Sequence, residues 1–186
     1  MILSAKKMIR RFAWKILGPL PQKYSHKVKV DGIGGIDTRQ PRFQMLDNAI
    51  VIVQHNTRIS HRENQVGEKG SLLGDYLEFG CFEGSTFLHS YKRAAPLMPW
   101  MRFLAFDSFQ GLPEPTGPDR DGEFWAGQFA CSQEGFLSNL EKNGVDPSRV
   151  ICVPGWFNES LTPKLKQENH LSIASIVYVD LSLIHI

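Results

Sequence analysis

Four short apolar segments, separated by stretches of helical character, constrain the fold of this chain more than any other feature. The segments are residues 75–80, 102–107, 149–155 and 172–180. Between the second and the third, a helix is predicted to follow Ser132 as its N-cap and to end before Gly144. Strands that alternate with helices form βαβ units, with a parallel sheet and helices on both faces. The sequence therefore predicts an α/β fold.

Further helices are predicted before, between and after these strands. Apolar residues at helical spacing, beginning at Phe43, predict an amphipathic helix that ends near Ile59, and a helix is also predicted over 85–95. A short helix is predicted over 159–168, with Pro163 in its first turn.

The N-terminal segment is basic and amphipathic. Five cationic residues lie within the first fifteen positions, and Lys15 interrupts the apolar part. A secretory signal needs roughly 7–15 uninterrupted apolar residues and a membrane span about 20, so neither is predicted. Two interpretations stay open: a terminal helix that packs on its own domain or on a partner, and a helix that lies on a membrane surface.

Composition narrows the class of protein. Hydrophobic residues make up 42% and charged residues 22%, which is typical of a globular chain, and a net charge of +2 is too near neutral to favour a nucleic-acid partner. Cys81, Cys131 and Cys152 have neither the spacing of metal ligands nor that of a disulfide framework. These cysteines predict a reducing compartment, and we expect a cytoplasmic protein.

The stretch "LEFGCFEGSTF" (77–87) carries the first candidate site. Ligands of open parallel sheets bind outside the carboxyl ends of the strands, and Glu78 and Gly80 stand at such an end. Gly80 allows a sharp turn, and Gly84 is expected to let a ligand approach the backbone closely. The spacing matches neither a dinucleotide fingerprint nor a phosphate-binding P-loop. A carboxylate at Glu78 would repel a pyrophosphate and attract an amine.

A second acid, Asp107, closes the next predicted strand, where it can accept hydrogen bonds from both hydroxyls of a ribose. An amine, a carboxylate, a ribose and no phosphate together describe S-adenosylmethionine. The sequence therefore predicts a site for this cofactor. A Rossmann protein that binds NAD or a nucleotide sugar is disfavoured by the glycine spacing.

With these residues identified, the chain resembles class I S-adenosylmethionine-dependent methyltransferases. It is similar in particular to the macrocin (TylF-type) O-methyltransferases, which methylate sugar hydroxyls of macrolides and aminocoumarins. The similar stretches, all within 74–181, are "GDYLEFGCFEGSTF", "FLAFDSFQGLPEP", "GQFACSQEGFLSNL", "RVICVPGWFNESLTP" and "SIVYVDL". The two that read "FDSFQGLPEP" and "PGWFNESLTP" are the most specific.

We expect three domains, and the resemblance implies a set of cofactor-binding residues. The domains are a basic amphipathic helix over 1–26, a loop and helical cap over 27–73, and a partial S-adenosylmethionine-binding Rossmann-like domain over 74–186. Glu78 would contact the amine, Asp107 the ribose, and the remaining residues would line the methionine and adenine parts. The whole set is Glu78, Gly80, Cys81, Gly84, Ser85, Asp107, Ser108, Phe109, Gly155 and Trp156.

The resemblance also implies a divalent cation, usually magnesium, and makes Asp180 a catalytic and metal-binding residue. Ser182 and Ile184 depart from the aspartate and tyrosine that the family has there. We therefore expect a domain that lacks its last strands, with "SLIHI" foreign to it.

The function implied is an O-methyltransferase that acts on a hydroxyl of a sugar or other small molecule. A non-catalytic cofactor-binding or interaction fragment is the alternative, and a homo-oligomer stays open. The aromatic residues Phe124, Trp125 and Phe129 of the long loop are expected either to cover the cofactor or to form a small hydrophobic cluster.

Overall fold

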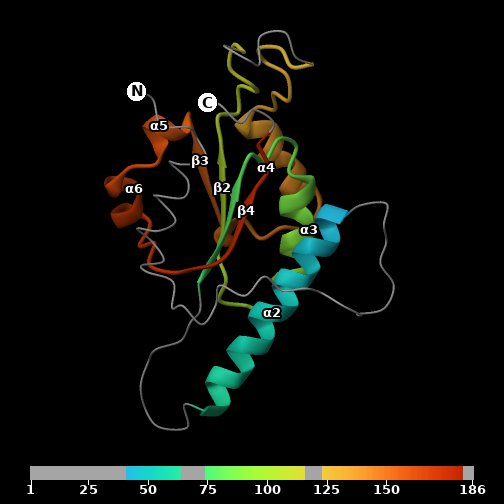
Figure 1. The fold of residues 1–186 in the computed structure, drawn as a ribbon, viewed down its shortest axis with the longest axis vertical. Helices are drawn as coiled ribbons and strands as arrows, with labels where there is room; N and C mark the ends of the chain where they lie inside the picture. The colour runs from blue at the N-terminus through green and yellow to red at the C-terminus, as the bar shows by residue number, and fades with distance from the viewer. Residues whose placement is uncertain (1–40, 64–73, 116–122, 182–186) are drawn as a thin grey trace.

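The computed structural model describes residues 41–63, 74–115 and 123–181 (Figure 1). Four parallel strands form one sheet in the order β3-β2-β1-β4. The strands are β1 (Asp75–Phe79), β2 (Phe103–Asp107), β3 (Val150–Pro154) and β4 (Ala174–Val179). The predicted parallel sheet is confirmed, and its strands differ from the predicted segments only at their ends. The predicted N-terminal helix (1–26), the segment 27–40 and the C-terminal residues 182–186 lie outside the described residues.

Strand β1 is central, and all five of its residues are buried. Its neighbours align so that Glu78 lies beside Ala105 of β2 and Tyr178 of β4. The buried carboxylate of Asp75 accepts two hydrogen bonds from the Arg102 guanidinium, at 2.8 and 2.7 Å. This bidentate pair compensates for the burial of the Asp75 charge.

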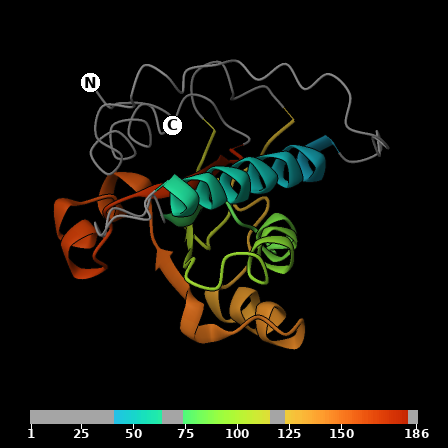
Figure 2. The ribbon, with the colours of Figure 1, turned by 90° about the horizontal axis from the view of Figure 1, so that it is seen from below.

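Helices cover both faces of the sheet, as predicted. One face carries α2 (Pro41–Glu63), α3 (Ser85–Ala94) and α4 (Gln133–Lys142), whereas α5 (Phe157–Ser160) and α6 (Pro163–Glu168) lie on the other (Figures 1 and 2). Within the described residues, no helix is both long and apolar enough to span a bilayer.

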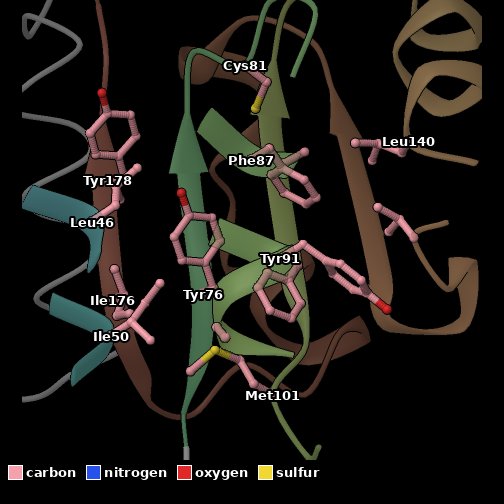
Figure 3. Close-up of a cluster of buried hydrophobic side chains, with 14 of the residues drawn as sticks. Leu46, Ile50, Tyr76, Cys81, Phe87, Tyr91, Met101, Leu140, Ile176 and Tyr178 are labelled. Carbon is pink, nitrogen blue, oxygen red and sulfur yellow. The ribbon is translucent and has the colours of Figure 1, made fainter. Parts of the chain in front are cut away.

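The larger hydrophobic core lies between the sheet and helices α2, α3 and α4. Figure 3 shows how side chains from distant segments meet there: Leu46 and Ile50 of α2 lie beside β4, while Phe87 and Tyr91 of α3 lie over the middle of the sheet. Helix α2 therefore packs on the same sheet as the helices of the 74–181 segment.

The cap residues of α4 are those predicted. The Ser132 hydroxyl accepts a hydrogen bond from the Gly135 amide at 3.0 Å, and Gly144, just after the helix, has a φ of 79°. The helix predicted over 159–168 was wrong in its continuity, because it is divided into α5 and α6. Pro163 has no amide hydrogen with which to continue α5, and the Thr162 hydroxyl caps a new helix by accepting from the Leu165 amide at 3.2 Å.

Arg149, directly before β3, fixes the connection between α3 and β2. Its guanidinium donates to the backbone carbonyl oxygens of Ala95, Met98 and Met101 at 2.8 to 3.2 Å. The same group lies over the Tyr91 ring, 5.5 Å from its centroid. No sequence pattern predicted this contact, because the bonded carbonyls belong to a distant irregular segment.

Candidate functional site

A cleft of about 320 Å³ lies at the carboxyl ends of all four strands. Its wall comes from the loop after β1, the start of α3, the segments that follow β2 and β3, and the end of β4. Arg42 and Phe129 complete the lining. This volume is typical of small-molecule sites, and the position is the one expected for an open parallel sheet.

Most of the predicted site residues meet in this cleft. Those that line it are Gly80, Cys81, Ser85, Asp107, Ser108, Gly155, Trp156 and Asp180. Glu78, Gly84 and Phe109 are not among the lining residues. Arg42, Phe82 and Thr86 line the cleft, but the sequence did not indicate them.

The Asp107 carboxylate organises the floor of the cleft. One oxygen accepts from the amides of Cys81 and Phe82, at 2.6 and 3.1 Å, and the other accepts from the Phe109 amide at 2.8 Å. A carboxylate has about four acceptor positions, so three amides leave capacity for one further donor. Asp107 thus joins the loop after β1 to the loop after β2, while its side chain lines the cleft.

Glu78 lies beneath the cleft. Its side chain is fully buried, Thr86 donates to one carboxyl oxygen at 2.6 Å, and Tyr76 donates to the other. Ser90 in turn donates to the Tyr76 hydroxyl at 3.1 Å. Thr86 lines the cleft in place of Glu78. The predicted direct contact between Glu78 and a ligand amine is therefore wrong in this structure.

Burial is the main cause that raises the pKa of Glu78 to about 7, and the nearby carboxylates of Asp180 and Asp107 raise it further. The hydrogen bonds from Thr86 and Tyr76 favour the ionised form and limit the rise. A proton at Glu78 is therefore gained or lost near neutral pH.

The two glycines of the loop serve packing. Both have positive φ, 84° at Gly80 and 85° at Gly84. A Cβ at Gly80 would overlap the carbonyl oxygen of Asp180, and one at Gly84 would lie 2.8 Å from the Phe136 ring of α4. The turn predicted at Gly80 is confirmed. The prediction that Gly84 makes room for a ligand is wrong, because Phe136 takes that space.

Three aromatic residues in or near the cleft have unusual backbone angles. Phe82, Phe109 and Phe129 have φ between 50° and 60°, a region that side chains with a Cβ rarely adopt. The Phe82 and Phe129 rings, both lining the cleft, meet edge to face with centroids 5.7 Å apart. Phe124 packs against Phe129, whereas Trp125 is 62% exposed. Of the three aromatic residues considered for the long loop, Phe129 thus belongs to the cleft. Phe109 instead packs on Phe136.

At the end of β4, Asp180 is exposed and lines the cleft, and the Tyr178 hydroxyl donates to it at 3.4 Å. Burial and the neighbouring Asp180 charge raise the pKa of Tyr178 to about 12, while the Arg42 charge acts in the opposite direction. Helix α2, which carries Arg42, packs against β4, so Arg42 lies on the β4 side of the cleft.

The predicted magnesium site is not supported by the described part of the chain. No three His, Cys, Asp or Glu side chains gather there in a way that could hold a metal ion. Ser182, where the resemblance implies a second aspartate, lies outside those residues.

Comparison with known proteins identifies a shared fold. No protein-family model matches the sequence, and no curated protein matches it. The structure of the O-methyltransferase NovP superimposes with a TM-score of 0.54 at 18% identity, covering 75% of this chain and 52% of NovP. The calicheamicin methyltransferase CalS11 superimposes with a TM-score of 0.50 at 20% identity, covering 82% of this chain and 74% of CalS11. The chain thus spans about half the length of NovP, and at these identities the likeness shows a common α/β Rossmann-like fold.

Proposed function

We propose that this protein binds S-adenosylmethionine and transfers its methyl group to a hydroxyl of a sugar or another small molecule. The observation that carries the proposal is the position of Asp107. Its carboxylate already accepts hydrogen bonds from the amides of Cys81 and Phe82, just after the carboxyl end of β1. A dinucleotide or P-loop site uses amides of this kind for phosphate, and here a phosphate would instead meet an acid. A nucleoside without phosphate fits this arrangement better.

The residues of the cleft suit the parts of this cofactor. Asp107 has capacity to accept a hydrogen bond from a ribose hydroxyl, and Trp156 and Ser108, the residues proposed for the adenine, line the same cleft. Bound S-adenosylmethionine supplies a methyl group on a positively charged sulfur. Transfer to an oxygen needs mainly alignment of the two reacting atoms, so the contribution of the chain is to orient both molecules and to exclude water. The O-methyltransferase activity named for NovP and the methyltransferase activity named for CalS11 agree with this proposal.

Asp180 faces the same cleft and remains the candidate catalytic residue. An exposed carboxylate at that position can orient an acceptor by accepting a hydrogen bond from its hydroxyl. This role requires no metal.

The test is calorimetric titration of the full chain with S-adenosylhomocysteine. We expect the wild type to bind and Asp107→Ala to bind more weakly, by about tenfold or more. The substitution removes a charge-assisted hydrogen bond to the ligand and the hydrogen bonds that hold the loop after β1. Glu83→Gln, an exposed acid in the same loop, is the matched control. Circular dichroism verifies that each variant is folded. Binding of NAD with no binding of S-adenosylhomocysteine would refute the proposal.

Turnover is tested separately, with S-adenosylmethionine labelled in its methyl group and a panel of sugars and catechols as acceptors. Transfer of label to a hydroxyl supports the enzyme. Tight cofactor binding without transfer to any acceptor favours the alternative, a non-catalytic cofactor-binding or interaction fragment.

A further inference from the structure

We infer that Arg42 is the residue that selects a ligand with a free α-amino-acid end, by binding its carboxylate. The inference rests on the proposed function and deepens it, because it assigns the methionine end of the ligand to the β4 side of the cleft. It also identifies a residue, far from the glycine loop in sequence, that discriminates between nucleosides.

The charges of the cleft carry the inference. Among the described residues that line it, Arg42 is the only basic one, and Asp107 and Asp180 are the acidic ones. Arg42 lies in the first turn of α2 and is exposed, so its guanidinium can reach a ligand without disturbing the core. A guanidinium presents donors in a fork that matches both oxygens of a carboxylate.

The placement of Arg42 relative to β4 explains why an amino acid fits better than a simple anion. Helix α2, which carries Arg42, packs against β4, and Asp180 directly follows β4. Arg42 and Asp180 thus lie on the same side of the cleft, which both of them line. A phosphate there would be attracted by Arg42 and repelled by Asp180. A zwitterion satisfies both charges, with its carboxylate at Arg42 and its amine toward Asp180.

The role of Asp180 follows from the burial of Glu78. Because Glu78 is fully buried and already accepts from Thr86 and Tyr76, it cannot be the direct partner of the amine. Asp180 is exposed and lines the cleft. The acid that the sequence suggested for the amine is thus replaced by Asp180, whose carboxylate has acceptor positions for the amine as well as for the acceptor hydroxyl.

The experiment compares two ligands that differ only at the amino-acid end. S-adenosylhomocysteine carries the α-amino carboxylate, and 5′-methylthioadenosine has the same thioether nucleoside without it. Both are titrated into the full-length wild type, Arg42→Ala, Arg42→Lys and the control Lys92→Ala, an exposed cation on α3. AMP is titrated in parallel as a phosphate probe. Thermal unfolding of each variant verifies that the fold is intact.

We expect Arg42→Ala to weaken the binding of S-adenosylhomocysteine about tenfold or more and to change the affinity for 5′-methylthioadenosine by less than about twofold. Arg42→Lys should recover part of the loss, and Lys92→Ala should bind as the wild type does. Equal weakening of both nucleosides, no weakening of either, or wild-type binding of AMP as tight as that of S-adenosylhomocysteine would overturn the role of Arg42. The last two leave the proposed function in place if S-adenosylhomocysteine still binds. If neither nucleoside binds the wild type, the proposed function and this inference both fail.

Discussion

Replacing Glu78 by glutamine should change how the stability of the protein depends on pH. Glutamine keeps the size of the side chain but cannot ionise, so the difference between the two proteins isolates the titration of one group. Glu78 is fully buried, and this burial raises its pKa from 4.5 to about 7. The folded protein therefore binds this proton more tightly than the unfolded chain does.

The sign of the effect follows from that difference. Below about pH 4.5 the carboxyl is neutral in both states, and its burial costs little. As the pH rises from about 4.5 to 7, the unfolded chain releases the proton first, so ionisation favours unfolding. At about 1.4 kcal/mol for each pH unit between the two pKa values, the wild type should lose roughly 3 kcal/mol of unfolding free energy through Glu78 alone.

The assay is urea unfolding of wild type and Glu78→Gln at pH 5 and pH 8. The unfolding free energy of the wild type relative to the variant should be lower at pH 8 than at pH 5 by roughly 2.5 kcal/mol, because at pH 5 the unfolded chain has already released part of this proton. Glu83→Gln removes an exposed acid from the adjacent loop. The difference in unfolding free energy between the wild type and this variant should be nearly the same at pH 5 and at pH 8. An equal difference between wild type and Glu78→Gln at both pH values would refute the reasoning, because it would mean that Glu78 titrates as it does in water.

Two further predictions concern the frame of the cleft. Gly80→Ala should lower the unfolding free energy by more than the ~1 kcal/mol that a positive φ alone costs, because the new methyl group would overlap the carbonyl oxygen of Asp180. Gly127→Ala, at a similar φ of 78° with nothing within 4 Å, should show only the backbone cost, and equal losses in urea unfolding of the two variants would contradict the packing argument. Arg149→Lys should lower the unfolding free energy by about 1–3 kcal/mol, because one ammonium cannot satisfy the three carbonyl oxygens before β2 to which the guanidinium donates. An unchanged midpoint of urea unfolding would show that those contacts contribute nothing to stability.

Parts of the fold and site were readable from local pattern. Short apolar segments that end in an acid or a glycine predicted strands β1 to β4 and the edge of the sheet at which the cleft lies. Ser132 and Gly144 predicted the ends of α4, because helix capping depends on a few adjacent residues. Asp107 was predicted for the same reason, since its position depends only on where β2 ends.

Other parts depended on contacts between distant segments. The spacing of Glu78 and Gly84 was compatible with ligand contact, but Thr86 and Phe136 occupy the positions that the ligand was expected to have. Arg42 carries no local signal for a site, because only the packing of α2 on β4 brings it to the cleft.

The sequence by itself determined the alternation of strands and helices and the acids at the strand ends, because both follow from backbone periodicity and chain direction. Only the tertiary structure decided which acid faces the cleft, which is buried beneath it, and which cation joins them. The direction of a side chain at a strand end is set by its neighbours in space, and at this cleft those neighbours come from segments far apart in the chain.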